Sequence, residues 1–173
     1  ARLAVQFTPY ETDSLIGVNI CWVPSVNDVS NELFLLTVWG DNNGQPGDVL
    51  YQDDFFFPRQ PQYHYDRNLF TTYYLKDTLR LEVSGKFYVG WRQFNADRLN
   101  VGLDKNIVNN DKTFYSIDGE ASWLQSQIEG SVMIRPLFST GMDVSLGIEQ
   151  QASLIRPSVV IYPNPTNGIV SID

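Results

Sequence analysis

The sequence predicts an all-β protein, a two-sheet β-sandwich of about nine or ten short strands with a jelly-roll-like arrangement. Residues 2–8 and 79–84 alternate apolar and polar side chains with a period of two, which is typical of strands with one face in solvent. No window sustains a helical apolar period with caps, so helix is expected to be nearly absent. Because a single sheet of this size would leave an aromatic face in water, two sheets are expected to pack face to face.

Each expected strand follows from its residue pattern. Residues 15–23, 33–39 and 87–94 carry large apolar side chains at successive positions and are expected to be central strands, covered on both faces. Turn-forming runs such as Asn42-Asn43-Gly44 and Pro46-Gly47 separate the segments. In chain order, the expected strands are residues 2–8, 15–23, 33–39, 49–57, 69–75, 79–84, 87–94, 99–103, 113–116 and 132–138.

The chain has 173 residues, the length of one domain, and its 43% hydrophobic content is enough for a sizeable core. Residues 1–139 are expected to form the β-sandwich domain. Residues 140–158 contain no aromatic side chain and are expected to be a linker or an edge strand. Residues 159–173 are expected to begin a second domain that continues beyond the last residue.

A proline-rich turn lies near the end of the chain, at Tyr162-Pro163-Asn164-Pro165-Thr166-Asn167-Gly168. Its prolines exclude helix and central strand, and Thr-Asn-Gly makes a tight turn before a short apolar alternation. This segment resembles the opening of the type A C-terminal sorting domain carried by proteins that the type IX secretion system of Bacteroidetes exports. The resemblance implies a truncated sorting domain at residues 159–173, with the type IX secretion machinery as a partner. It also implies a secreted protein or one held at the outer-membrane surface.

Four further segments, residues 39–51, 87–93, 100–106 and 133–136, resemble in this order the signatures of an uncharacterised jelly-roll-like domain. That domain is found just ahead of type IX sorting domains. Together the segments span most of residues 3–138. This resemblance implies a fold and a location, but it supplies no chemistry.

Charge and cysteine content exclude several classes of partner. The formal net charge is −8, so no basic field exists to attract nucleic acid or an anionic membrane. No apolar stretch approaches the roughly 20 residues that span a bilayer, so membrane insertion is not expected. Cys21 is the only cysteine and lies in an apolar run, where a small buried core residue is expected.

No catalytic or metal-binding residue is expected. His64 is the only histidine, and neither it nor Cys21 lies in a nucleophile motif. One histidine and one cysteine cannot complete the usual zinc ligand set, and no other cofactor is expected. Asp41, Asn43 and Asp48 offer oxygen ligands to calcium, but their spacing favours a plain turn.

Acidic side chains leave one catalytic alternative open. Carboxylates roughly 5 to 9 Å apart cleave glycosidic bonds, and a sequence does not reveal such separations. The residues that would supply a pair are Asp53, Asp54, Asp104, Glu120 and Glu129. Solvated charges and turn caps are the simpler interpretation. Asp104 is also expected to form a structural ion pair with Arg92 or Arg135, because burial of a lone charge costs several kcal/mol.

Aromatic side chains give the sharper functional hint, since they make up 13% of the chain. Sugar rings stack on exposed aromatic faces while neighbouring polar groups bond the hydroxyls. Trp22 and Trp91 lie in the most apolar strands and are expected to be core. The candidate ligand-binding residues are Trp39, Tyr63, Tyr65 and Trp123.

These observations predict a non-catalytic, extracellular module of a larger secreted protein, with a binding or adhesive role and a glycan as candidate ligand. The alternative is a structural spacer that presents the sorting domain. A carboxylate-based glycoside hydrolase is the least favoured of the three.

Overall fold

The computed structural model describes residues 1–24, 28–64, 66, 68–76, 79–95, 99–119 and 121–139. The chain divides into two compact units, Ala1–Ser139 and Thr140–Asp173. The second unit lies outside the described residues, and so do the expected linker at 140–158 and the sorting motif at 162–168.

The described part of the chain is all-β, as predicted. The described residues contain no α-helix, and the helical element with described bounds is a short 3₁₀ turn, η2 (Asn110–Lys112). The strands are β1 (Arg2–Phe7), β2 (Asp13–Ile20), β3 (Phe34–Asn42), β4 (Gln45–Gln52), β5 (Thr71–Tyr74), β6 (Leu81–Val83), β7 (Phe87–Gln93), β8 (Leu103–Asp104), β9 (Thr113–Ser116), β10 (Leu124–Gln125), β11 (Ser131–Val132) and β12 (Ile134–Phe138).

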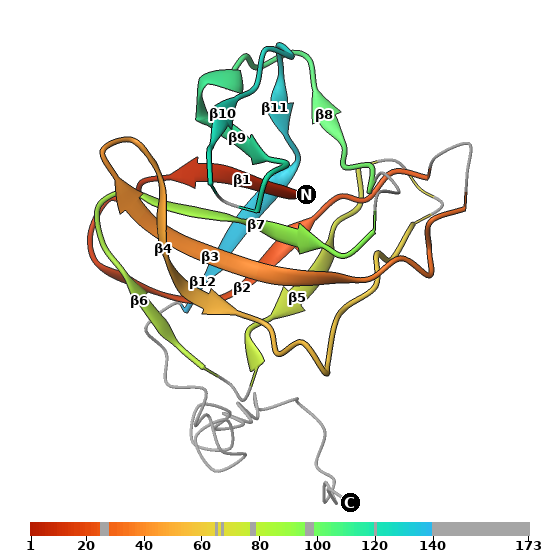
Figure 1. Cartoon of the computed structure of the whole chain (residues 1–173), viewed down its shortest axis with the longest axis horizontal. Coiled ribbons are helices and arrows are strands. Elements are labelled where there is room, and N and C mark those ends of the chain that lie inside the picture. Colours follow the sequence, from red (N-terminus) through yellow and green to blue (C-terminus); the bar gives the residue numbers. More distant parts are fainter. Residues whose placement is uncertain are drawn as a thin grey trace, which may run out of the picture. The chain divides into compact units, whose positions relative to one another are not determined.

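Two antiparallel sheets form the sandwich (Figure 1). The larger sheet has the order β10-β9-β1-β7-β3-β4, and the smaller has the order β12-β2-β5, with β6 also paired to β2. The chain crosses repeatedly between the sheets, from β1 to β2 and back to β3, as it does in jelly rolls. A separate pair, β8 and β11, lies near β9 and β10 at one end of the sandwich (Figure 1).

The main core lies between the two sheets and follows from strand alternation. Every second side chain of β3 and β7 enters this core, because neighbouring residues of a strand point to opposite faces. Residues of the larger sheet that enter it include Phe34, Leu36, Val38, Phe87, Val89 and Trp91, and those of the smaller sheet include Leu15, Val18, Ile20, Tyr73 and Ile134. The expected central strands are confirmed, since β3 and β7 are interior to the larger sheet and β2 is interior to the smaller.

The predicted strand at residues 49–57 is wrong in its second half, because β4 ends at Gln52. The next residues turn instead: Asp54 accepts hydrogen bonds from the backbone N–H groups of Phe56, at 2.9 Å, and Phe57, at 3.0 Å. Phe55, Phe56 and Phe57 are consequently exposed. The predicted strand at residues 99–103 also differs, since only Leu103–Asp104 forms a strand there, and the two-residue strands β10 and β11 were not expected.

Candidate binding groove beside β5

The structure buries one tryptophan that the sequence analysis expected to be exposed. Trp22 and Trp91 are buried in the main core with ring centroids 4.9 Å apart, as expected. Trp39, predicted to be exposed, is fully buried. It follows Val38 on β3 and therefore points away from the main core, onto the outer face of the larger sheet.

A second hydrophobic cluster on that outer face explains the burial of Trp39. It contains Ala4, Trp39, Tyr88 and Phe114, with Trp123 packed against them. The rings of Trp39 and Trp123 meet edge to face, with centroids 5.4 Å apart. Trp123 covers its partner and stays partly exposed, so these two candidate residues form a small core and not a platform for a sugar.

Neither candidate tyrosine is seen as an exposed ring on which a sugar could stack. Tyr65 lies outside the described residues. Tyr63 packs against the main core, and within the described part of the chain its buried hydroxyl has no hydrogen-bond partner. Burial raises the pKa of this hydroxyl, so Tyr63 stays neutral at ordinary pH.

An open groove lies beside β5, at the edge of the smaller sheet opposite to β12. Its volume is about 610 Å³. The side chains that give it chemical character are Phe57, Arg59, Gln60, Gln62, Tyr74 and Lys76. Strand alternation sets its aromatic part, because Tyr73 points into the core while Tyr74, 61% exposed, points out.

A buried ion pair holds Arg59, one of the lining residues, in place. The carboxylate of Asp53 accepts hydrogen bonds from Arg59 Nε at 2.6 Å and Nη2 at 2.7 Å. It also accepts from the backbone N–H of Leu36 at 2.8 Å and from the hydroxyl of Tyr51 at 2.7 Å. This satisfied carboxylate fixes the Arg59 guanidinium, which lines the groove.

The hydroxyl of Tyr73 holds in place the segment that carries Gln60 and Gln62, which also line the groove. It accepts from Trp22 Nε1 at 2.8 Å and from the backbone N–H of Gln62 at 3.2 Å, and it donates to the carbonyl of Gln60 at 3.0 Å. Burial raises the pKa of Tyr73 to about 12, so the donated proton is retained. The backbone carrying Gln60 and Gln62 is thereby tied to the core.

Lys76 supplies a charge without a fixed acceptor. Its ammonium lies 4.5 Å from the centre of the Phe57 ring, a cation–π contact. Within the described part of the chain, the buried Nζ atom has no hydrogen-bond partner. The groove thus combines two exposed rings, Phe57 and Tyr74, with the exposed amides of Gln60 and Gln62 and the Arg59 guanidinium, while the Lys76 ammonium is buried beside Phe57.

Three of the five carboxylates named from the sequence have structural partners. Asp53 is the buried anion that pairs with Arg59, and Asp54 caps the turn after β4. Asp104 accepts from the backbone N–H of Asn106 at 2.8 Å. Glu129 is exposed, and Glu120 lies outside the described residues.

Among the residues that the structure describes, Asp104 does not form the expected ion pair with Arg92 or Arg135. The Arg135 guanidinium lies 4.2 Å from the centre of the Phe70 ring instead, and Arg135 is exposed. Arg135 alternates outward from Ile134 and so never carries a charge into the core, which removes the physical reason for the pairing. The buried ion pair is the one between Asp53 and Arg59, which the sequence analysis did not predict.

The remaining candidates have structural roles. The loop after β3 is a two-residue hairpin turn in which Asn43 and Gly44 both have positive φ, and Asp41 accepts from the backbone N–H of Gly44. The expected turn is formed. His64 Nε2 lies 3.0 Å from the Thr71 hydroxyl, which donates its proton to the Gln62 carbonyl, so His64 Nε2 is the donor.

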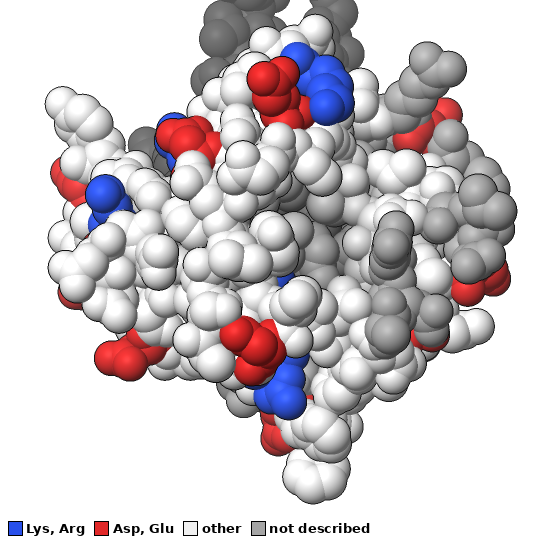
Figure 2. Space-filling view, turned by 45° about the horizontal axis from the view of Figure 1, so that its top comes forward, with Lys and Arg blue, Asp and Glu red and all other residues white. Residues whose placement is uncertain are grey.

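Cys21 is buried, as expected, and burial raises the pKa of its thiol. In the part of the chain that the structure describes, no three His, Cys, Asp or Glu side chains gather as metal ligands would. No helix in that part is long and apolar enough to cross a bilayer. On the face shown in Figure 2, charged side chains lie scattered among uncharged residues.

Searches against protein-family models, curated proteins and solved structures each returned no match to this chain.

Proposed function

We propose that this chain is a non-catalytic β-sandwich module of an exported protein and that it binds carbohydrate through the groove beside β5. The observation that carries the proposal is the pairing of exposed rings with polar groups in one open groove: Phe57 is 65% and Tyr74 is 61% exposed. Sugar rings stack on such aromatic faces, and amides, arginine and lysine bond their hydroxyls.

The groove is prepared for binding before a ligand arrives. The Asp53 carboxylate fixes Arg59, and the Tyr73 hydroxyl fixes the backbone at Gln60 and Gln62. A binding surface that is already ordered loses little conformational entropy on binding, which favours affinity. The open form of the groove suits a chain of sugars that passes through it better than a ligand that must be enclosed.

The absence of catalysis is part of the proposal. No acidic side chain is among the described residues that line the groove, and Asp53, which holds the lining residue Arg59, already accepts from Arg59, Tyr51 and Leu36. A general acid or base needs a proton that it can exchange with substrate, and this carboxylate is enclosed by donors. A glycoside hydrolase consequently has little support.

The proposal places the module outside the cell. The support is the resemblance of Tyr162, Pro163, Asn164, Pro165, Thr166, Asn167 and Gly168 to the type IX sorting motif, with the type IX machinery as the export partner. A bacterial surface or its surroundings supply the glycans that such a module would hold. Neither nucleic acid nor an inserted membrane is proposed as a partner, since the net charge is −8.

The second candidate is a structural spacer that presents the sorting domain. It is favoured by the burial of Trp22, Trp39 and Trp91, which leaves fewer exposed rings than the composition suggested. The two functions differ in one measurable respect, because a spacer needs no ligand.

A glycan array followed by titration calorimetry tests the proposal. We expect at least one glycan to bind saturably, and Tyr74→Ala to weaken that binding by about tenfold or more through the lost stacking. Tyr10→Ala is the matched control, since Tyr10 is fully exposed and lies outside the groove. If no glycan binds, or if Tyr74→Ala and Tyr10→Ala lose glycan affinity equally, the structural spacer becomes the favoured function.

A further inference from the structure

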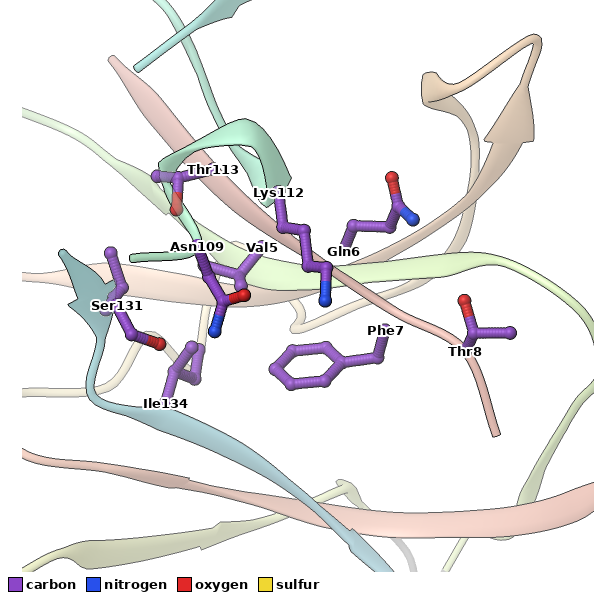
Figure 3. A pocket seen from close by; sticks show the side chains of 10 residues that line it. Val5, Gln6, Phe7, Thr8, Asn109, Lys112, Thr113, Ser131 and Ile134 are labelled. Carbon is purple, nitrogen blue, oxygen red and sulfur yellow. The ribbon is translucent and has the colours of Figure 1, made fainter. Parts of the chain in front are cut away.

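A second pocket lies at the opposite edge of the smaller sheet, where β1, η2, β11 and β12 meet (Figure 3). Its volume is about 300 Å³, at the lower end of the range for small-molecule sites. Apolar side chains of Val5, Phe7, Val132 and Ile134 contribute to its walls. We call it the β1–β12 pocket.

The pocket exists because two strand edges stop pairing at this place. β9 pairs with β1 only from Arg2 to Val5. On that side of β1, Phe7 therefore has no neighbouring strand among the described residues, although its other side pairs with β7. β12 pairs with β2 alone and forms the edge of its own sheet. The gap between the two edges reaches the side of the main core, against which Phe7 and Val132 pack.

Three polar side chains border this apolar space. In Figure 3 the ammonium of Lys112 and the amide of Asn109 point toward the space beside the Phe7 ring, and Ser131 lies at its margin. Each of the three can donate a hydrogen bond, and the described contacts assign none of them a side-chain partner. Gln6 points the other way, onto the outer face, where its amide lies 3.4 Å from the Tyr88 hydroxyl.

The charge of the lining is opposite to that of the whole chain. Lys112 is the one cation of the lining, and no acidic side chain is among the described residues that line it, although the net charge of the chain is −8. A single ammonium with an amide and a hydroxyl balances one negative charge. It does not match the two charges of a phosphate monoester.

We propose that the β1–β12 pocket binds a small organic carboxylate. The carboxylate group lies against Lys112, Asn109 and Ser131, and its ring or hydrocarbon body packs on Phe7, Val132 and Ile134. This site is separate from the groove beside β5 and does not depend on carbohydrate binding there.

Titration with benzoate and glucuronate, each paired with a neutral analogue, tests the assignment. Benzamide and glucose are those analogues, and amide chemical shifts in ¹H–¹⁵N NMR spectra report the binding. We expect saturable shifts at Phe7, Asn109 and Ser131 with at least one carboxylate, and binding at least about tenfold weaker for its neutral analogue.

Three variants make the test specific. Lys112→Met keeps the hydrocarbon stem and is expected to weaken carboxylate binding about tenfold, since Lys112 is exposed and its loss leaves the fold intact. Arg80→Met removes one exposed charge elsewhere and is expected to leave binding unchanged. Tyr74→Ala, which alters only the groove, is also expected to retain it.

Several results would overturn the assignment. These are the absence of saturable shifts with both carboxylates, equal binding of the neutral analogues, or equal losses in Lys112→Met and Arg80→Met. None of these results bears on the groove, which the glycan titrations test separately.

Discussion

The Arg59 guanidinium holds the Asp53 carboxylate with two hydrogen bonds, at 2.6 and 2.7 Å, across a turn where the sequence analysis predicted the second half of the strand at residues 49–57. The Asp53 side chain is completely buried and that of Arg59 is 16% exposed. Each charge therefore depends on the other, because removal of one leaves the other desolvated and unpaired.

Asp53→Asn is expected to destabilise the fold by about 3–5 kcal/mol, since it leaves the Arg59 charge without its partner. Urea unfolding followed by tryptophan fluorescence measures the change. Asp54→Asn is the control, because Asp54 is exposed and caps a turn, and we expect it to cost about 1 kcal/mol or less. Equal losses in the two variants would contradict the structural role of the ion pair.

Tyr73→Phe removes one oxygen that serves three partners, Trp22 Nε1, the Gln62 N–H and the Gln60 carbonyl. We expect a loss of about 2–4 kcal/mol in the free energy of unfolding, because buried polar groups are left unsatisfied. Tyr74→Phe is the matched comparison, since Tyr74 is exposed, and it is expected to change stability by less than about 0.5 kcal/mol. A harmless Tyr73→Phe would mean that these bonds do not fix the groove wall.

The fold is expected to weaken in alkali. Burial raises the pKa of Tyr73 to about 12, above the unfolded value of about 10, so its stabilising contribution is complete below pH 10. Between pH 10 and 12 that contribution is lost at up to about 1.4 kcal/mol per pH unit. Burial also raises the pKa of Tyr88, so Tyr73→Phe reduces the slope of unfolding free energy against pH without abolishing it. An unchanged slope in that variant would contradict the assignment to Tyr73.

Trp39→Ala is expected to cost about 3–5 kcal/mol, as large-to-small changes of buried aromatics do. Trp123→Ala removes the edge-to-face partner and is expected to cost about 1 kcal/mol, with glycan binding retained. Calorimetric titration of both soluble variants checks the second point. Loss of glycan binding in a folded Trp123→Ala protein would move the binding surface to the outer face of the larger sheet.

Gly90→Ala is expected to destabilise the sandwich by about 3 kcal/mol. A Cβ atom at Gly90 would lie 1.8 Å from the carbonyl oxygen of Leu3, so the paired strands β1 and β7 would have to separate. Gly40→Ala in β3 is the control, since its nearest contacts would be ordinary ones of 3.7 Å or more. Thermal unfolding of the two variants compares them, and similar midpoints would contradict the close approach at Gly90.

Strand identity and the main core followed from alternation, because period-two patterns and apolar runs are local properties of the chain. Trp22 and Trp91 were placed correctly for that reason. The burial of Trp39 was not predicted. Alternation shows that its side chain faces away from that of Val38, but it does not show which residues cover it on that face. Trp123, which covers it, is 84 positions further along the chain (123 − 39), and long-range contacts of this kind leave no local pattern.

The groove was missed for a related reason. Tyr73 and Tyr74 are adjacent and identical in type, and only the sheet register shows that one is core and the other exposed. A sequence signal would have been an alternation of polar and apolar residues, which the run Thr71-Thr72-Tyr73-Tyr74 lacks. The ion pair of Asp53 and Arg59 gave no such signal, since the turn at residues 54–57 brings the two together.

The burial of Cys21 makes the chain convenient for site-specific labelling. Thiol reagents attack the thiolate, and Cys21 is 6% exposed with a raised pKa, so it reacts slowly. A cysteine introduced at the exposed Tyr10 position would therefore be the one that maleimide dyes modify. A fluorophore attached there would label the protein at one defined site, with the native thiol left in place.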